Sequence, residues 1–163
     1  MARNVLRILF LSVLYSGKCP KAPGTIGSLV SVFLGLPLLY YSVHTLFLLA
    51  CLLGVIAIRE IDIFEKSSQT HDEKWIVIDE LVGVWIAMAI AGLSIIGVIG
   101  AFVFFRIFDI WKPSVIGRID RQVKGGLGVV LDDVLAGFLG GIATLLLLKI
   151  FAYFDLSPNL WIL

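Results

Sequence analysis

Hydrophobic residues form five long runs, and polar segments separate them. The runs cover residues 26–43, 44–58, 75–93, 94–108 and 134–154. A helix rises about 1.5 Å per residue, so runs of this length come close to the roughly 30 Å of a hydrocarbon core, although the second and fourth fall short. The pattern predicts an all-α, polytopic helical membrane domain of four to five short spans. Five spans is the simplest count, and four spans with one re-entrant or interfacial helix is the alternative.

Composition supports lipid as the surrounding medium. The chain has 163 residues, enough for a single domain over 1–163, of which 60% are hydrophobic and 15% charged. Its mean hydropathy is +1.03. Soluble domains average about 45–50% apolar and about 25% charged residues, so a water-soluble globule and a disordered chain are both disfavoured. A net charge of +1 argues against a nucleic-acid partner.

The charged residues are distributed unevenly along the chain. With five crossings, segments 1–25, 59–74 and 106–133 lie on one side of the membrane, and every Lys and Arg except Lys149 falls in them. Basic loops stay in the cytoplasm, so we expect the N-terminus and both long loops there and the C-terminus outside. All acids except Asp155 share the cytoplasmic side, which predicts a site on that face.

The N-terminus and the cysteines suggest no further processing. Residues 1–17 resemble a signal peptide in charge and apolarity, but residues 18–21 contain no small-residue cleavage site, so we expect the segment to be retained. Cys19 and Cys51 are too few for a disulfide framework or a metal pair, and we expect both to be free thiols.

Two pairs of adjacent acids stand next to apolar helices. Asp79-Glu80 opens one helix, and Asp132-Asp133 follows the Gly-rich segment 125–128 at the predicted start of another. An acid within a membrane costs roughly 2.5–3.5 kcal/mol near the bilayer centre. One acid would suffice to cap a helix, so the repeated pair favours a functional role over capping. The Gly-rich segment is not a P-loop, because no Gly-Lys-Ser/Thr follows it.

A third cluster ends the fourth apolar run. If the helix continues to Lys112, then Arg106, Asp109 and Lys112, spaced three apart, project from nearly one helix face, and Pro113 should end the helix. Two cations beside a carboxylate suit the binding of a phosphate. The alternative is a set of end-of-span side chains that reach the interface.

Two polar segments are weaker candidates. The turn at 21–28 places the hydroxyls of Thr25 and Ser28 at a helix N-terminus, where an anion can bind, although a plain helix cap is an equal alternative. His71-Asp72 lies in a polar loop ahead of Glu80, where a histidine is more often simply solvated.

The carboxylates together predict a metal. Five acids near lipid carry more negative charge than such a site tolerates without a divalent cation, and oxygen ligands favour Mg²⁺. Zinc is not expected, because the cysteines are distant in sequence and the histidines few. Magnesium beside basic residues suggests phosphoryl chemistry. The predicted ligands are Asp79, Glu80, Asp109, Asp132 and Asp133.

Small residues predict close helix packing. Gly137 and Gly141 form a small-xxx-small pair on the last helix, and Ala136 with Gly140 forms a second. Gly83 would let another helix approach the acids four residues before it. The alternative is that glycine is simply common in membrane helices.

Four of these segments, in order over about residues 17–141, resemble bacterial phosphatidylglycerophosphatase A. They are Pro23-Gly24-Thr25-x-Gly27-Ser28; His71-Asp72 ahead of Asp79-Glu80-x-x-Gly83; Arg106-x-x-Asp109-x-x-Lys112-Pro113; and Gly125-Gly126-x-Gly128 with Asp132-Asp133-x-x-Ala136-Gly137.

The resemblance implies a Mg²⁺-dependent lipid phosphatase of the bacterial inner membrane. It would remove the terminal phosphate of phosphatidylglycerophosphate on the cytoplasmic side and yield phosphatidylglycerol. Asp79, Asp109, Asp132 and Asp133 would then be catalytic as well as metal-binding. Water attack and a transient aspartyl-phosphate both stay open, as does the oligomeric state.

The remaining roles follow from the same hypothesis. Arg106 and Lys112 would neutralise the phosphate, Thr25 and Ser28 would position it, and His71 or Asp72 would orient water or protonate the leaving alkoxide. The alternative function is a small transporter or channel subunit that passes ions along interfacial acids, which predicts acids spread through the membrane depth.

Overall fold

The computed structural model describes residues 2–68, 73–113, 116–118 and 122–154, and all regular structure in them is helical. The all-α prediction is therefore confirmed. The elements are α1 (Ala2–Leu11), the 3-10 turn η1 (Ser16–Lys18), α2 (Pro23–Tyr41), α3 (Val43–Ser68), α4 (Ile78–Ala91), α5 (Ile95–Trp111) and α7 (Gly126–Tyr153).

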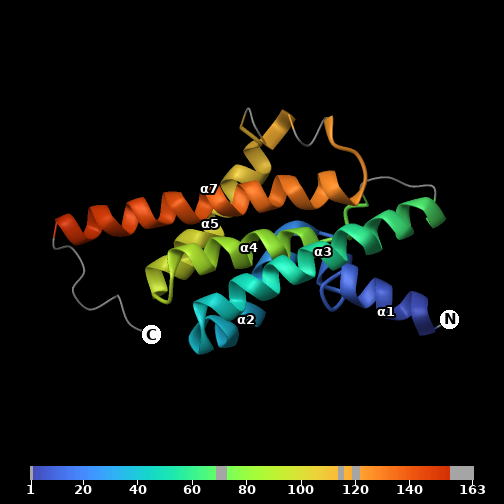
Figure 1. The fold of residues 1–163 in the computed structure, drawn as a ribbon, viewed down its shortest axis with the longest axis horizontal. Helices are drawn as coiled ribbons and strands as arrows, with labels where there is room; N and C mark the ends of the chain where they lie inside the picture. The colour runs from blue at the N-terminus through green and yellow to red at the C-terminus, as the bar shows by residue number, and fades with distance from the viewer. Residues whose placement is uncertain (1, 69–72, 114–115, 119–121, 155–163) are drawn as a thin grey trace.

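Helix α4 forms the centre of the bundle. It lies between α7 and α3 in Figure 1, and it packs most extensively against α7. Eleven of its fourteen residues are buried, including Trp85, whose indole Nε1 donates to the Ser31 carbonyl of α2 at 2.8 Å. The hydrophobic core of the protein is thus built around one short helix that other helices cover.

Glycines bring α4 and α7 into backbone contact, as predicted. A Cβ added at Gly137 would lie 2.3 Å from the Gly83 carbonyl oxygen, and one at Gly141 would lie 2.7 Å from Ile90 Cβ. Gly83 and Ile90 follow one another along α4 in the same order as their partners Gly137 and Gly141 along α7. The two helices therefore run in the same direction. Each helix therefore presents its first turns at the same end of the bundle.

The local sequence explains where α5 begins and ends. Ser94 caps its start, because the Ser94 hydroxyl accepts from the Gly97 amide at 2.9 Å. The helix ends at Trp111, and Lys112 adopts a left-handed conformation with φ 44° directly before Pro113. The predicted stop at Pro113 is confirmed.

The second acid pair does not open a helix, contrary to the sequence prediction. Helix α7 begins at Gly126, so Asp132 and Asp133 stand in its second turn. The apolar run marks only the lipophilic part of this helix, and glycines that usually break helices form its first turn instead. Capping therefore does not explain this pair.

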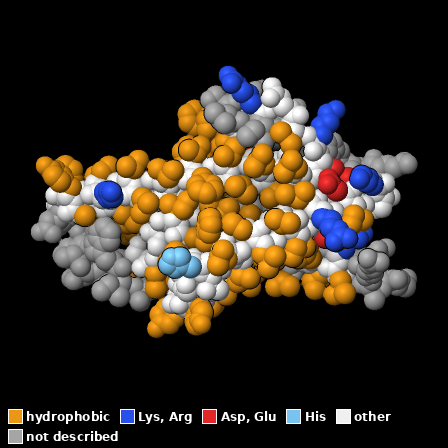
Figure 2. Space-filling model, in the orientation of Figure 1, with side chains coloured by type: hydrophobic (Ala, Val, Ile, Leu, Met, Phe, Trp, Pro, Cys, Tyr) orange, Lys and Arg blue, Asp and Glu red, His pale blue; other side chains and the backbone are white. Residues whose placement is uncertain are grey.

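Within the residues that the structure describes, two helices are long and apolar enough to cross a membrane, namely α2 with 19 residues and α7 with 28. On the face shown in Figure 2, hydrophobic side chains cover the middle of the molecule, and charged side chains gather mainly toward one end. Helices α4 and α5 have 14 and 17 residues, fewer than the roughly 20 that a perpendicular span needs. The two long helices and the apolar surface are consistent with a membrane protein.

Both cysteines are free thiols, as expected. Cys51 is exposed on α3, and Cys19 is partly exposed after η1.

Candidate functional site

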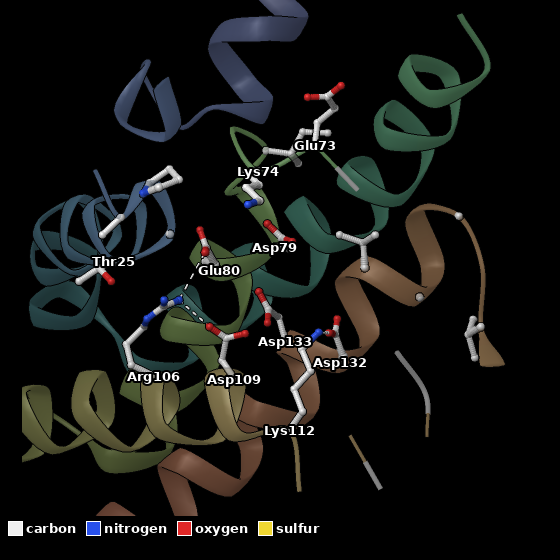
Figure 3. Close-up of a pocket in the computed structure, with 18 residues that line it drawn as sticks. Thr25, Glu73, Lys74, Asp79, Glu80, Arg106, Asp109, Lys112, Asp132 and Asp133 are labelled. Atoms are coloured by element: carbon white, nitrogen blue, oxygen red, sulfur yellow. Dashed lines mark hydrogen bonds and ion pairs between the residues drawn. The ribbon is translucent and has the colours of Figure 1, made fainter. Parts of the chain in front are cut away.

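The starts of α2, α4 and α7 and the end of α5 surround a polar cavity of about 580 Å³ (Figure 3). Acidic side chains in its lining outnumber basic ones by two to one. The acids are Glu73, Asp79, Glu80, Asp109, Asp132 and Asp133, and the bases are Lys74, Arg106 and Lys112.

The structure brings most of the predicted site residues to this one cavity. All five predicted metal ligands line it, together with Thr25, Arg106 and Lys112. Ser28 is fully buried beside the cavity and does not line it, because its hydroxyl donates to the Gly24 carbonyl within α2 at 2.8 Å. His71 and Asp72 lie outside the described residues.

Asp79 and Asp133 owe their proximity to the glycine contact. Each acid stands four residues, about one helical turn, before one of the two touching glycines, Gly83 and Gly137. Since α4 and α7 run in the same direction, both carboxylates emerge on the same side of the contact. Figure 3 shows Asp79 and Asp133 near one another at the cavity.

Arg106 ties three helices together at the cavity wall. Its Nη1 donates to Asp109 Oδ2 at 2.5 Å, to Glu80 Oε1 at 3.3 Å and to the Ser28 hydroxyl at 3.4 Å. Its side chain is only 15% exposed. The guanidinium is thus held at the cavity by acids of α4 and α5.

Lys112 links the end of α5 to α7. Its Nζ lies 2.7 Å from Asp132 Oδ2, which is itself nearly buried. The left-handed backbone at Lys112 turns the chain at this point, so the ammonium group reaches α7. A second cation therefore stands at the cavity beside a carboxylate.

Several buried polar atoms of the cavity have no partner. Among the residues that the structure describes, Asp79 Oδ1, Glu80 Oε2 and Arg106 Nε are buried without a hydrogen bond. Buried polar groups are nearly always paired in folded proteins, so orphaned atoms here indicate groups kept for a ligand. A carboxylate oxygen calls for a cation or a donor, and a guanidinium N–H calls for an acceptor.

The first turn of α2 approaches the acids closely. A Cβ at Gly24 would lie 2.1 Å from Glu80 Oε1, and one at Gly27 would lie 3.1 Å from Glu80 Oε2. These glycines let the α2 backbone close one side of the cavity next to Thr25. The glycines of segment 21–28 thus serve for close approach, and none of the described side chains caps the start of α2.

Three further residues contribute without having been predicted. Glu73 and Lys74 line the cavity from the segment before α4. Asp62 of α3 accepts a hydrogen bond from the Gly126 amide at 2.7 Å and so neutralises the N-terminus of α7. Isolated charges in polar segments have no distinguishing spacing, so no sequence signal marked them.

The donor set suits Mg²⁺ by its chemistry. Carboxylate oxygens from α4, α5 and α7 share one cavity, and two of the oxygens are orphaned. As the side chains lie, no three acid, imidazole or thiol groups in the described part of the chain converge on one point. A bound cation would therefore require side-chain rotations that draw the acids together.

Known proteins are similar to this chain over most of its length. The family model described as phosphatidylglycerophosphatase A matches residues 9–148. Phosphatidylglycerophosphatase A of Escherichia coli (strain K12) is 38% identical over 129 residues, which cover 76% of this chain and 73% of the relative. That of Haemophilus influenzae is 40% identical over 126 residues, with 74% and 76% covered.

A third relative carries a different substrate in its name. A Bacteroides thetaiotaomicron protein named as a candidate phosphatidylinositol-3-phosphatase is 36% identical over 137 residues, which cover 75% of this chain and 80% of that protein. No solved structure matches the chain. The family model covers the cavity residues and most of the chain, and the chain therefore belongs to the phosphatidylglycerophosphatase A family of phosphatases.

Proposed function

We propose that the cavity removes the terminal phosphate of phosphatidylglycerophosphate and yields phosphatidylglycerol. The observation that carries this proposal is the convergence of acids and cations from α4, α5, α7 and the segments next to them at one end of an apolar bundle. Relatives named for this reaction support the choice of lipid. A phosphomonoester of a membrane lipid matches a polar site that adjoins an apolar surface.

Arg106 and Lys112 bind the phosphate in this proposal. Arg106 has a buried Nε without a partner, so it can donate to a phosphate oxygen while its Nη1 stays with Asp109. Lys112 stands at the same cavity as a point charge, beside Asp132. Two cations, one on α5 and one directly after its end, would fix the phosphate in orientation as well as in position.

The acids Asp79, Glu80, Asp109, Asp132 and Asp133 would hold Mg²⁺. Bound there, Mg²⁺ would act as a Lewis acid and stabilise negative charge that develops on the phosphate oxygens. Without a cation, carboxylates this close and this buried repel each other and lose solvation. The orphaned oxygens of Asp79 and Glu80 support this assignment.

Thr25 and Ser28 complete the proposed substrate site. Thr25 offers a hydroxyl at the cavity beside the first turn of α2. Ser28 acts indirectly, because its hydroxyl accepts a hydrogen bond from Arg106 and so helps to orient the guanidinium. We retain His71 or Asp72 as the group that orients water or protonates the leaving alkoxide.

We further propose a multi-pass protein of the bacterial inner membrane whose cavity opens to the cytoplasm. The direction of the helices supports this topology, because α2, α4 and α7 begin at the cavity whereas α5 ends there. Each of the five predicted apolar runs overlaps one helix, and short helices can span when the bilayer thins or neighbours cover them. The basic residues concentrate in the segments next to the cavity.

The transporter alternative is not favoured. An ion path needs polar groups at successive depths, whereas the acids of the cavity lie at one end of the bundle. Family membership also favours a phosphatase.

Phosphate release from defined lipids tests the proposal. The purified protein in detergent would receive phosphatidylglycerophosphate, phosphatidylinositol 3-phosphate or phosphatidic acid, with Mg²⁺ or with EDTA. We expect inorganic phosphate from phosphatidylglycerophosphate in Mg²⁺, slower release from the other two lipids, and loss of activity in EDTA. No release in Mg²⁺ would refute the phosphatase, and an equal rate in EDTA would refute the metal.

A further inference from the structure

An apolar groove of about 520 Å³ runs along α5 beside the polar cavity. Its apolar wall consists of Phe102, Val103, Ile107, Ile110 and Trp111. These positions recur at helical spacing, so they form one continuous stripe of α5. The size is within the range of ligand sites, about 300–1,000 Å³.

Most side chains of this stripe are exposed at the protein surface. Ile110 and Trp111 are 71% and 74% exposed, and Val103 and Ile107 are each more than 40% exposed. Large apolar groups in such numbers on one face indicate contact with an apolar partner. For a protein embedded in a lipid bilayer, the expected apolar partner is the hydrocarbon chain of a lipid.

The groove and the cavity share two lining residues, Thr25 of α2 and Arg106 of α5. Arg106 separates the two spaces, because its guanidinium is paired with Glu80 and Asp109 on the cavity side. Arginine commonly behaves in this way, with an apolar stem against hydrocarbon and a charged head in a polar site. One molecule with a phosphate head and an apolar tail would fill both spaces at once.

Two other grooves of the described residues lack this continuity. An apolar groove bordered by Phe10, Leu38 and Trp85 shares no lining residue with the cavity. A smaller one near Lys149 lies along α7 far from the acids and shares none either. Bulk lipid can cover those surfaces, but it cannot also reach the phosphate site from them.

We propose that the α5 groove binds an acyl chain of the substrate while the phosphate occupies the cavity. The lipid then enters sideways from the membrane, between the start of α2 and the end of α5, without leaving the leaflet. This inference rests on the proposed function and adds to it the site that recognises the apolar part of the substrate. It assigns Val103 and Ile107 to substrate binding.

Filling the groove tests this assignment. Val103→Trp places a bulky side chain in the groove, and the matched control Val55→Trp places one on α3, where Val55 is 68% exposed and borders none of these grooves. The readout is kcat/KM for long-chain phosphatidylglycerophosphate divided by kcat/KM for its deacylated, water-soluble head group. We expect this ratio to fall about tenfold in Val103→Trp, because the apolar contact of the chain is lost, and to stay unchanged in Val55→Trp.

The outcomes separate the two proposals. If the wild type releases phosphate from neither substrate, the proposed function fails. If the wild type is active on the lipid and the ratio is the same in Val103→Trp and Val55→Trp, the function stands and the acyl-chain groove is refuted.

Photolabelling gives a second readout that does not depend on turnover. A phosphonate analogue of the substrate, which cannot be hydrolysed, would carry a photoreactive group on its acyl chain, and phosphatidylcholine with the same group is the control lipid. We expect the analogue to label α5 in preference to α3, and the control lipid to label both helices alike. The same α5 to α3 ratio for both lipids would overturn the proposal.

Discussion

Asp79 and Asp133 are placed by the glycines that follow them. Each acid lies four residues before a glycine at the α4–α7 contact, and the two glycines touch through backbone atoms. The two carboxylates therefore lie near one another. A side chain larger than a hydrogen atom at either glycine would push the two helices apart, and the carboxylates with them. The placement of the acids therefore depends on glycines, which have no functional group of their own.

Replacing one of these acids should abolish activity without unfolding the protein. Asp79→Asn removes a charge but keeps the shape, so we expect phosphate release to fall by at least about 100-fold. The measurement is the initial rate in Mg²⁺, with the melting temperature in detergent as the check on folding. Glu65→Gln on α3, away from the cavity, is the control. Wild-type turnover by Asp79→Asn would rule out Asp79 as a catalytic and metal-binding residue.

Arg106 should be sensitive even to a conservative change. Lysine keeps the positive charge but cannot contact Glu80, Ser28 and Asp109 while also donating to phosphate, because it lacks the planar fork. We therefore expect Arg106→Lys to raise KM for the lipid phosphate by about tenfold. Arg118→Lys, at an exposed position, serves as the control. An unchanged KM in Arg106→Lys would exclude Arg106 from substrate binding.

At the scale of single residues, sequence spacing predicts which side chains of one helix lie together at the site. Arg106 and Asp109 could be grouped because residues three apart share a helix face, whereas Lys112 stands just past the end of α5 and lines the cavity from a left-handed backbone position. Asp62 could not, because its bond to the Gly126 amide joins α3 to α7 across 64 positions. Such a contact depends on how the helices pack, which local spacing does not specify.

At the scale of elements, α4 organises the bundle because its faces are covered by α2, α3, α5 and α7. The apolar runs predicted its existence and its approximate limits. They did not predict that α3 continues to Ser68 or that α7 begins at Gly126. Hydropathy reports on the lipophilic part of a helix, whereas backbone hydrogen bonds continue into polar turns.

The contact between α4 and its neighbours should tolerate no added methyl group at Gly83. A Cβ there would lie 2.4 Å from the Phe105 ring and 2.6 Å from the Asp133 carbonyl. We expect Gly83→Ala to destabilise the protein by about 1–3 kcal/mol through overpacking, and to lower activity by separating the acids. Thermal unfolding in detergent measures the first effect.

Gly54→Ala on α3 is the matched control. Its added Cβ would find its nearest atom at 3.4 Å, close to ordinary contact, and alanine favours the helix. We expect little loss of stability there. Equal melting temperatures for Gly83→Ala and Gly54→Ala would contradict the close α4–α7 packing.

At the scale of the whole molecule, the polar cavity lies at one end of a largely apolar bundle. The sequence predicted this separation, because with five crossings nearly all charged residues fall in segments on the same side of the apolar runs. The sequence pattern does not determine the number of membrane crossings, since α4 and α5 are shorter than a full span and neighbouring helices cover α4. Length and hydropathy cannot distinguish a short buried span from a re-entrant helix.

Cysteine labelling in whole cells tests the proposed topology. Cys19 and Cys51 would first be replaced by serine, and single cysteines introduced as Lys124→Cys before α7 and Ser42→Cys between α2 and α3. We expect a membrane-impermeant thiol reagent applied from outside to label Ser42→Cys only, and Lys124→Cys to react once the cells are opened. Labelling of Lys124→Cys in intact cells would reverse the orientation.

The most direct test of the central claim is the position of a divalent cation in an experimental structure. Crystals of the protein grown with Mn²⁺ in place of Mg²⁺ would show the ion by its anomalous scattering. We predict a peak inside the cavity, with carboxylate oxygens of both α4 and α7 within coordination distance of about 2.0–2.2 Å. A peak elsewhere, or none in the cavity of a protein that is active with Mn²⁺, would contradict the account.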